Sequence, residues 1–282
     1  MSIVLKENDW ARERILARTL DKKPTETLRR VARYYLDEGF SPSVTRKKLE
    51  SFLIQCDPTA SLVKWSEGLD HAISYAKKYQ AVEIESIPIT HREMEQIDSL
   101  SGKQIQRLAF TLLCLAKYWV AVRPECDGWV SNKDNEIMLL ANVKTSIKRQ
   151  SFMYYTLRET GMLQFSKKVD NTNVRVCFIS DDEPVLEVKD FRNLGYQYHM
   201  YHGEPYFECD NCGIVTKIAV PGVGRKQKYC KECAAEIAVQ QTVNSHMRPI
   251  SYIETEKENN HENYQIFQHE QPVLQEQREQ SR

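Results

Sequence analysis

The chain has 282 residues, and its 41% hydrophobic and 28% charged residues are ordinary for a soluble protein. This length allows two modest domains with extensions. No apolar run approaches the roughly 20 residues that a membrane span needs, and the start lacks the apolar core of a signal peptide. We therefore expect a cytoplasmic location, with no membrane partner.

The formal net charge of zero hides an uneven distribution along the chain. Residues 101–180 carry 12 Lys and Arg against 6 Asp and Glu, and residues 205–248 carry 6 against 4. The first hundred residues balance at 16 against 16, and residues 251–282 carry 3 against 7. Positive charge is concentrated in the middle of the chain, which is where nucleic-acid binding should be sought.

Residues 1–80 are expected to form a helical N-terminal domain. Apolar residues recur there at spacings of three and four, and proline and glycine mark the ends of the segments. One helix start combines Ser41, a good N-cap residue, with Pro42 at the first helical position. The predicted helices cover residues 10–20, 24–38, 43–55 and 61–79.

A second domain is expected over residues 81–200. Thr90 and Glu93 have the spacing of a capping box, which predicts that a helix starts between them. Residues 104–122 predict a strongly apolar helix, with Leu108, Leu112, Leu115 and Trp119 on its buried side.

The next part of this domain combines two helices with a short connection. Residues 135–141 predict a short helix and residues 142–144 a three-residue turn. Thr145 is a good N-cap for a longer helix that runs to Glu159. Gly161 then supplies a left-handed stop.

Two alternating segments follow the second helix. Residues 163–168 and 174–179 place apolar side chains at every second position, and the intervening residues 170–173 are polar. This pattern predicts a β-hairpin whose turn lies at the polar residues.

Helix, turn, helix and hairpin in this order resemble a winged helix-turn-helix domain. The resemblance runs from the helix at residue 104 to residue 179, and Thr160-Gly161-Met162-Leu163 is similar to the exit of that fold's recognition helix. It implies that the second helix lies in a major groove of DNA, with its N-terminal half toward the bases.

The resemblance also implies which side chains contact DNA. Ile147, Tyr154 and Leu157 would face inward. Arg and Gln suit base edges, whereas Lys and Ser suit phosphates, and wing residues would reach the flanking backbone or the minor groove. The expected contact residues are Lys144, Ser146, Lys148, Arg149 and Gln150 on the helix, and Lys167, Lys168 and Arg175 on the wing.

A protein-binding role is the alternative for this domain. Winged helices also serve as docking modules, in which a basic surface is merely solvated. The chain would then be an adaptor that binds protein partners of the replication or transcription machinery. The local excess of positive charge favours double-stranded DNA as the partner. A homodimer is compatible with either role, although no helix shows a sustained heptad repeat.

Residues 191–207 are rich in aromatic side chains. Such side chains can stack on unpaired bases, but more often they pack. We expect packing that fastens the small segment that follows to its neighbour. We do not expect His202, within this stretch, to bind a metal, because the following cysteines suffice.

Four cysteines in two CxxC pairs form the most specific motif of the chain. Cys209 and Cys212 are separated from Cys230 and Cys233 by the 17 residues 213–229. Two such pairs can hold one metal in a tetrahedral shell of four sulfurs, and this spacing is typical of structural zinc. A redox pair or disulfides are less consistent with it. Iron is disfavoured against Zn²⁺ because nothing nearby suggests electron transfer.

The residues around these cysteines predict a zinc ribbon. Gly213 directly follows the first pair, where the backbone needs positive φ. Residues 214–220 and 226–229 read as two short strands, with residues 221–224 as the turn that joins them. A closed shell leaves no position for water, so the metal should organise a fold and not catalyse.

The ribbon and a following short helix would make a third domain over residues 201–248. Residues 249–282 are rich in Glu, Gln, Asn and His, so we expect them to be a disordered polar tail. The other four cysteines are scattered and are expected to be buried thiols in a reducing compartment. They are Cys56, Cys114, Cys126 and Cys177.

Taken whole, the sequence predicts a mainly α protein with small β parts: a helical N-terminal region, a winged helix and a C-terminal zinc ribbon. The chain resembles uncharacterised proteins of phages and mobile elements of Gram-positive bacteria, notably in the run GRKQKYC-x-x-C-A from Gly224 onward. It would then be a regulator or a replication-associated factor. No phosphate-binding loop or hydrolase motif is present, so we expect no enzymatic activity.

Overall fold

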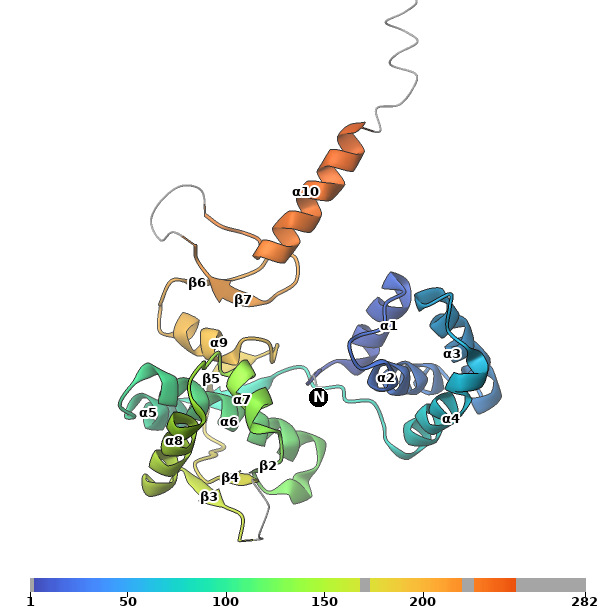
Figure 1. Cartoon of the computed structure of the whole chain (residues 1–282). Helices are drawn as coiled ribbons and strands as arrows, with labels where there is room; N and C mark the ends of the chain where they lie inside the picture. The colour runs from blue at the N-terminus through green and yellow to red at the C-terminus, as the bar shows by residue number, and fades with distance from the viewer. Residues whose placement is uncertain (1–2, 168–172, 220–225, 247–282) are drawn as a thin grey trace, which may run out of the picture. The chain divides into compact units, whose positions relative to one another are not determined.

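A computed structural model describes residues 3–167, 173–219 and 226–246 (Figure 1). The protein is mainly helical with small antiparallel sheets, as the sequence predicts. It divides into two compact units, Met1–Lys228 and Tyr229–Arg282. The polar tail at residues 249–282, Lys168 on the wing and the turn at residues 221–224 lie outside the described residues.

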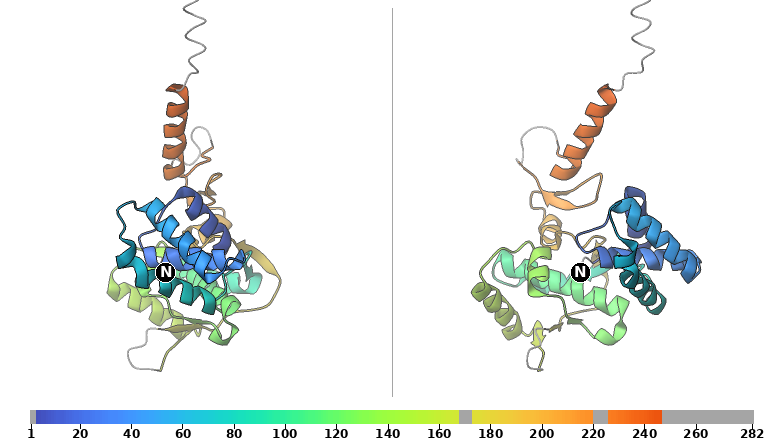
Figure 2. Two further views of the ribbon diagram at one scale, coloured as in Figure 1. Left: turned by 90° about the vertical axis from the view of Figure 1, so that its right-hand side faces the viewer. Right: turned by 45° about the vertical axis from the view of Figure 1, so that its right-hand side comes forward.

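Four helices form a bundle around the smaller of two hydrophobic cores (Figures 1 and 2). Leu28, Val31, Leu49, Leu53 and Leu69 are fully buried in it. Serine side chains cap two of the helices, as Ser41 accepts a hydrogen bond from the Val44 amide at 3.4 Å. The helices are α1 (Glu7–Ala17), α2 (Pro24–Asp37), α3 (Pro42–Cys56) and α4 (Leu62–Lys78).

Two chain segments connect this bundle to the larger core. The amide of Glu7 donates to the Val82 carbonyl at 2.9 Å, and the amide of Ile84 donates to the Leu5 carbonyl at 2.9 Å. Leu5 is buried in the larger core, not in that of the bundle. The Glu7 carboxylate is buried too, where it accepts hydrogen bonds from Arg30, Arg33 and the Val82 amide.

The larger core is built around α6 (Lys103–Val122). By length and composition, α6 is the one helix within the described residues that could cross a membrane. Most of its apolar window is buried inside the protein, which is the pattern of a core helix in a soluble domain. Leu108, Leu112 and Leu115 are fully buried, as expected, and Trp119 packs against the core while partly exposed.

A buried ion pair links α6 to α5 (His91–Asp98). Thr90 and Glu93 form the expected capping box: the Thr90 hydroxyl accepts from the Glu93 amide, and the Glu93 carboxylate accepts from the Thr90 amide at 2.8 Å. The same carboxylate, which is fully buried, contacts the Lys117 ammonium at 2.8 Å and accepts from the Ser180 amide at 2.9 Å. One acidic side chain therefore ties α5, α6 and the segment at Ser180 together.

The described residues contain three small sheets. In the first, β1 (Ile87–Thr90) pairs with β5 (Pro184–Val188), a strand for which the sequence carried no prediction. In the second, the order is β2-β4-β3, in which β3 (Leu163–Phe165) and β4 (Val174–Val176) form the expected hairpin. A further short strand, β2 (Trp129–Val130), follows the 3₁₀ turn Pro124–Cys126 and extends this sheet.

Two helices with a short connection precede the hairpin. They are α7 (Asp134–Leu140) and α8 (Ile147–Glu159). The prediction that Thr145 caps α8 is wrong: the cap is Ser146, whose hydroxyl accepts from the Arg149 amide at 3.4 Å. Gly161 has φ 76°, as the stop signal predicts, and the amide of Met162 returns to the Leu157 carbonyl at 3.0 Å.

The aromatic-rich segment forms α9 (Leu194–Tyr201) and packs as expected. Tyr198 is buried and its ring centroid lies 5.6 Å from that of Phe110 in α6. Tyr206, on the strand that follows, stacks on His199 with ring centroids 5.6 Å apart. The His202 ring lies 3.1 Å from the Asp98 carboxylate.

Candidate functional site

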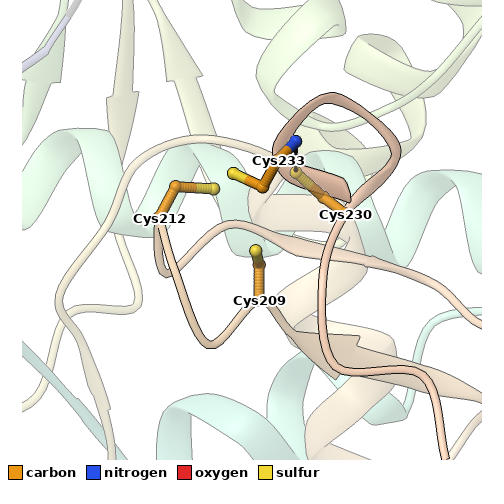
Figure 3. A group of neighbouring side chains, drawn as sticks. All are labelled: Cys209, Cys212, Cys230 and Cys233. Atoms are coloured by element: carbon orange, nitrogen blue, oxygen red, sulfur yellow. Dashed lines mark hydrogen bonds between the residues drawn. The ribbon is translucent and has the colours of Figure 1, made fainter. Parts of the chain in front are cut away.

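The four CxxC cysteines lie close together. Their sulfur atoms are all within 4.8 Å of one another, and their side chains converge on a common centre (Figure 3). Around a tetrahedral metal with metal–sulfur bonds of about 2.3 Å, the sulfurs would be about 3.8 Å apart. Cys209, Cys230 and Cys233 are buried and Cys212 is half-buried. The cluster could therefore hold one metal ion in a closed shell.

Tight backbone turns present the first pair. Gly213 has φ 71°, a conformation that favours glycine, and its amide donates to the Cys209 carbonyl at 2.9 Å. The Cys209 amide in turn donates to the Ile214 carbonyl at 3.0 Å, and the Asp210 amide to the Lys228 carbonyl at 2.9 Å. These bonds bring the approach to the second pair alongside the first turn.

The second pair lies at the start of a helix, α10 (Lys231–His246). The Cys233 amide points at the Cys230 sulfur at 3.5 Å, and the Ala234 amide donates to the Cys230 carbonyl at 2.9 Å. The N-terminal end of a helix carries partial positive charge, which stabilises a thiolate there. This end of α10 therefore suits the anionic form that binds metal.

The predicted pairing of the strands in this region is wrong. The strand β7 (Val215–Lys217) pairs with β6 (Tyr206–Glu208), which precedes the first cysteine pair. Residues 226–229, expected to be the partner strand, have no strand conformation. They still contribute through the Lys228 carbonyl and through the Gln227 side chain, which accepts from the Ala219 amide at 3.2 Å.

Arg192 and Asn193, which directly precede α9, connect the first cysteine turn to the larger core. The Arg192 guanidinium donates to the Cys212 carbonyl and is paired with the Asp190 carboxylate. The hydrogen bond with Asp190 raises the pKa of Arg192, and Cys212 adds to the shift. Asn193, with φ 55°, donates to the Val215 carbonyl at 3.0 Å. The sequence analysis did not single out either residue.

The same asparagine reaches the connection between α7 and α8. Its side-chain carbonyl accepts a hydrogen bond from the Asn142 amide group at 2.9 Å. Asn142 has φ 53°, so it is the left-handed residue that turns the chain between the two helices. Asn193 thus bonds both to this turn and to the segment that carries Cys209 and Cys212.

The residues expected to contact DNA from α8 are mostly exposed. Lys144, Ser146, Lys148 and Arg149 are exposed, and Gln150 is half-buried. Two of them already have partners within the protein. The Ser146 hydroxyl caps the helix, and the Arg149 guanidinium donates from Nε to the Gln104 side chain at 3.4 Å.

The inward face of α8 is partly as predicted. Tyr154 and Leu157 are buried, and burial raises the pKa of the Tyr154 hydroxyl. The prediction for Ile147 is wrong, because this residue is 81% exposed. It is the first residue of α8, where no preceding turn covers it.

The wing residues differ in how they are engaged. Lys167 is exposed at the end of β3, and Lys168 lies outside the described residues. Arg175 on β4 is half-buried; its Nη2 contacts the Asp127 carboxylate at 2.6 Å and its Nε donates to the Asp127 carbonyl at 2.9 Å. Arg175 therefore holds the start of β2 in place, and it would have to leave these contacts to reach DNA.

Two exposed aromatic residues on α8 were missed in the sequence analysis. Phe152 is 63% exposed and Tyr155 is 51% exposed, on the same side of the helix as Lys148. Their positions at intervals of four and three residues could have revealed this stripe.

The remaining cysteines lie apart from this cluster. Cys114 is fully buried, which raises the pKa of its thiol and fits the expected inert role. Cys56 and Cys126 are half-buried. The expectation of burial is wrong for Cys177, which is exposed on the strand side of the larger core.

Comparison with known proteins adds no assignment. No protein-family model, curated protein or solved structure matches this chain significantly.

Proposed function

We propose that this protein binds double-stranded DNA in the cytoplasm through a winged helix whose recognition helix is α8. The proposal is supported mainly by the exposed basic residues on the outward face of α8 and on the turn that precedes it. It presents Lys144, Lys148 and Arg149 beyond a short connection from α7, and a hairpin with exposed Lys167 follows. This combination of a basic helix surface and a neighbouring basic hairpin suits a major groove and its flanking phosphates.

Basic residues and residues that reach base edges would have different roles in DNA binding. Lys144, Lys148 and Lys167 would neutralise phosphates, which contributes affinity without sequence preference. Side chains that reach base edges from the N-terminal half of α8 would supply the preference. A role as a regulator or replication-associated factor of a mobile element follows from such binding.

We also propose that the cysteine cluster holds one structural Zn²⁺. Four thiolates complete the shell, so the ion would stabilise the fold around β6, β7 and α10 and take no part in catalysis. Elemental analysis of protein purified without added metal should find one zinc per chain. The finding of no metal, or of iron, would contradict this assignment.

A salt titration of DNA affinity tests the proposed function. We expect fluorescence-labelled duplex DNA to bind at low salt, with log K falling linearly against log salt concentration. The variant Lys144→Ala/Lys148→Ala should weaken binding to all sequences and reduce the slope by about two, because each lysine that neutralises a phosphate contributes roughly one.

The matched control is Lys47→Ala/Lys64→Ala, which removes two exposed lysines from the helical bundle. This variant should bind DNA like the unmodified protein. Equal losses in both variants would show that only net charge matters. No binding at low salt, together with a protein partner that survives nuclease treatment, would favour the adaptor role.

A further inference from the structure

The outward face of α8 is more apolar than its role in DNA binding would first suggest. Lys148, Phe152 and Tyr155 follow one another at intervals of four and three residues, so they share one side of the helix. Phe152 is 63% exposed and Tyr155 is 51% exposed. The buried residues Met153, Tyr154 and Leu157 occupy the other side.

Several polar groups nearby are already engaged. The Ser151 hydroxyl donates to the Ile147 carbonyl at 3.1 Å, and the Thr156 hydroxyl donates to the Phe152 carbonyl at 2.9 Å. Arg149 lies at the edge of this face and donates to Gln104. The side chains best placed to approach a partner from the middle of α8 are therefore aromatic.

The charges around this face indicate the kind of partner. Lys144, Lys148 and Arg158 are exposed on or beside α8, and the one acidic side chain of the helix, Glu159, is its last residue. A polyanion suits such a surface better than an apolar protein groove. In the major groove, the apolar group available to a phenylalanine is the 5-methyl group of thymine.

We propose that Phe152 recognises thymine in the major groove through its 5-methyl group. This inference rests on the proposed binding of double-stranded DNA and adds a base preference to it. Lys148, one turn before Phe152, contacts a neighbouring phosphate. Tyr155, one turn after Phe152, covers the thymine contact on the side opposite Lys148. The site that the protein prefers therefore contains at least one thymine that it recognises by its methyl group.

Replacing thymine by uracil tests this inference, because uracil has the same hydrogen-bonding edge and lacks only the methyl group. The probe is the duplex most enriched from a random-sequence pool by the full-length protein. It is compared with the same duplex in which all thymines, and then single thymines, are replaced by uracil. Loss of one buried methyl group should weaken binding about three- to fivefold.

The variant Phe152→Ala should bind the thymine and uracil duplexes alike. Because Phe152 is largely exposed, this variant should fold, which circular dichroism checks. The matched control is Leu139→Ala, which removes a side chain from α7 that is 74% exposed and should leave the preference for thymine intact.

The outcomes separate this inference from the proposed function. Tight binding that is indifferent to uracil would overturn the inference and leave DNA binding standing. A preference for thymine that persists in Phe152→Ala would overturn the assignment to Phe152. Binding to no duplex at low salt would overturn DNA binding itself, and a protein partner lost in Phe152→Ala would then assign this face to protein docking.

Discussion

At Gly195, the chain passes so close to a neighbouring helix that a methyl group has no room. A Cβ atom at this position would lie 2.0 Å from the Ala141 carbonyl oxygen and 2.9 Å from Cδ of Arg107. The first of these is a backbone atom, so it cannot move aside without moving the turn after α7. This contact sets the spacing between α9 and the connection that leads to α8.

Substitution of Gly195 therefore has a defined expected effect. Gly195→Ala should lower the free energy of unfolding by about 1–3 kcal/mol, as overpacking in a core does. Gly68→Ala is the matched control, because Gly68 is also helical and a Cβ there would meet nothing closer than 3.5 Å. That change should raise stability by about 0.5–1 kcal/mol. Urea denaturation measures both, and a neutral Gly195→Ala would contradict the close contact.

The buried carboxylate of Glu93 allows a second test. Its two oxygens accept from the Thr90 and Ser180 amides and contact the Lys117 ammonium. Glu93→Gln keeps the size but leaves Lys117 buried beside a neutral group, which should cost about 3–5 kcal/mol.

A double variant separates the lost pair from the lost cap. Glu93→Gln/Lys117→Met removes the stranded charge, so it should recover a large part of the stability that Glu93→Gln loses in a urea titration. If the double variant were as unstable as the single one, the unpaired charge would not be the cause.

Sequence reasoning succeeds at residues whose role is set by close neighbours in the chain. The capping box joins Thr90 to Glu93, three positions later in the chain. Gly161, with its positive φ, directly follows the C-cap of α8. It fails for Ile147, because moving the cap from Thr145 to Ser146 makes Ile147 the first helical residue. The spacing that predicts an inward side chain does not apply before the first turn is complete.

At the scale of elements, α10 should depend on the metal. Among its described side chains, Cys233 is buried and Ile237 is half-buried, whereas the others are exposed. A 16-residue helix with so little packing is marginal by itself. Cys233 lies in its first turn and Cys230 directly precedes it, so metal binding would anchor the end at which the helix begins.

Removal of the metal should therefore lower the helical content of the protein. Cys233→Ser should lose zinc, by elemental analysis, and should lose part of the helical signal in far-ultraviolet circular dichroism. Cys177→Ser, which changes an exposed cysteine outside the cluster, should keep both. An unchanged spectrum in zinc-free Cys233→Ser would show that α10 is stable without the ion.

The elements differ in how far their sequence determines them. The bundle helices are predicted to within a few residues because the apolar period and the caps lie within each helix. The sheets are not, because a strand needs a partner that can lie far along the chain: β1 pairs with β5 almost a hundred residues later. The partner of β7 was predicted at residues 226–229 because residues 221–224 read as a turn that joins two short strands, yet β6, on the other side of Cys209, is its actual partner.

For the candidate site, the sequence predicts the ligands but not their support. The CxxC spacing identifies Cys209, Cys212, Cys230 and Cys233, since each pair is formed by one local turn. Arg192 and Asn193 could not be predicted, because their contacts depend on how α9 packs against α6. On α8, the buried Met153, Tyr154 and Leu157 leave Phe152 on the opposite, outer face.

At the scale of the molecule, the two hydrophobic cores should unfold separately. The bundle core and the larger core have no buried residue in common. The chain's four tryptophans report on them in pairs: Trp10 and Trp65 pack against the bundle core, Trp119 packs against the larger core, and Trp129 lies in the sheet beside it.

Two variants make this measurable by fluorescence during urea denaturation. Trp119→Phe/Trp129→Phe leaves only the reporters of the bundle, and Trp10→Phe/Trp65→Phe leaves only those of the larger core. The bundle should unfold at the lower urea concentration because it buries fewer apolar side chains. Coincident midpoints would show that the two cores form one cooperative unit.

The pairing of Leu5 with Ile84 has a consequence for how this chain is assembled. Leu5 is part of the larger core, and the chain then forms the four helices of the bundle before it returns at Val82. The Glu7 amide, at the start of the bundle, donates a hydrogen bond of 2.9 Å to the Val82 carbonyl, at its end. The four-helix bundle thus lies between two short stretches of chain, one at Leu5 and one at Val82–Ile84, that both pack with the larger core. A short loop could take its place, whereas a truncation that starts after the bundle would also remove Leu5 from the core that it helps to fill.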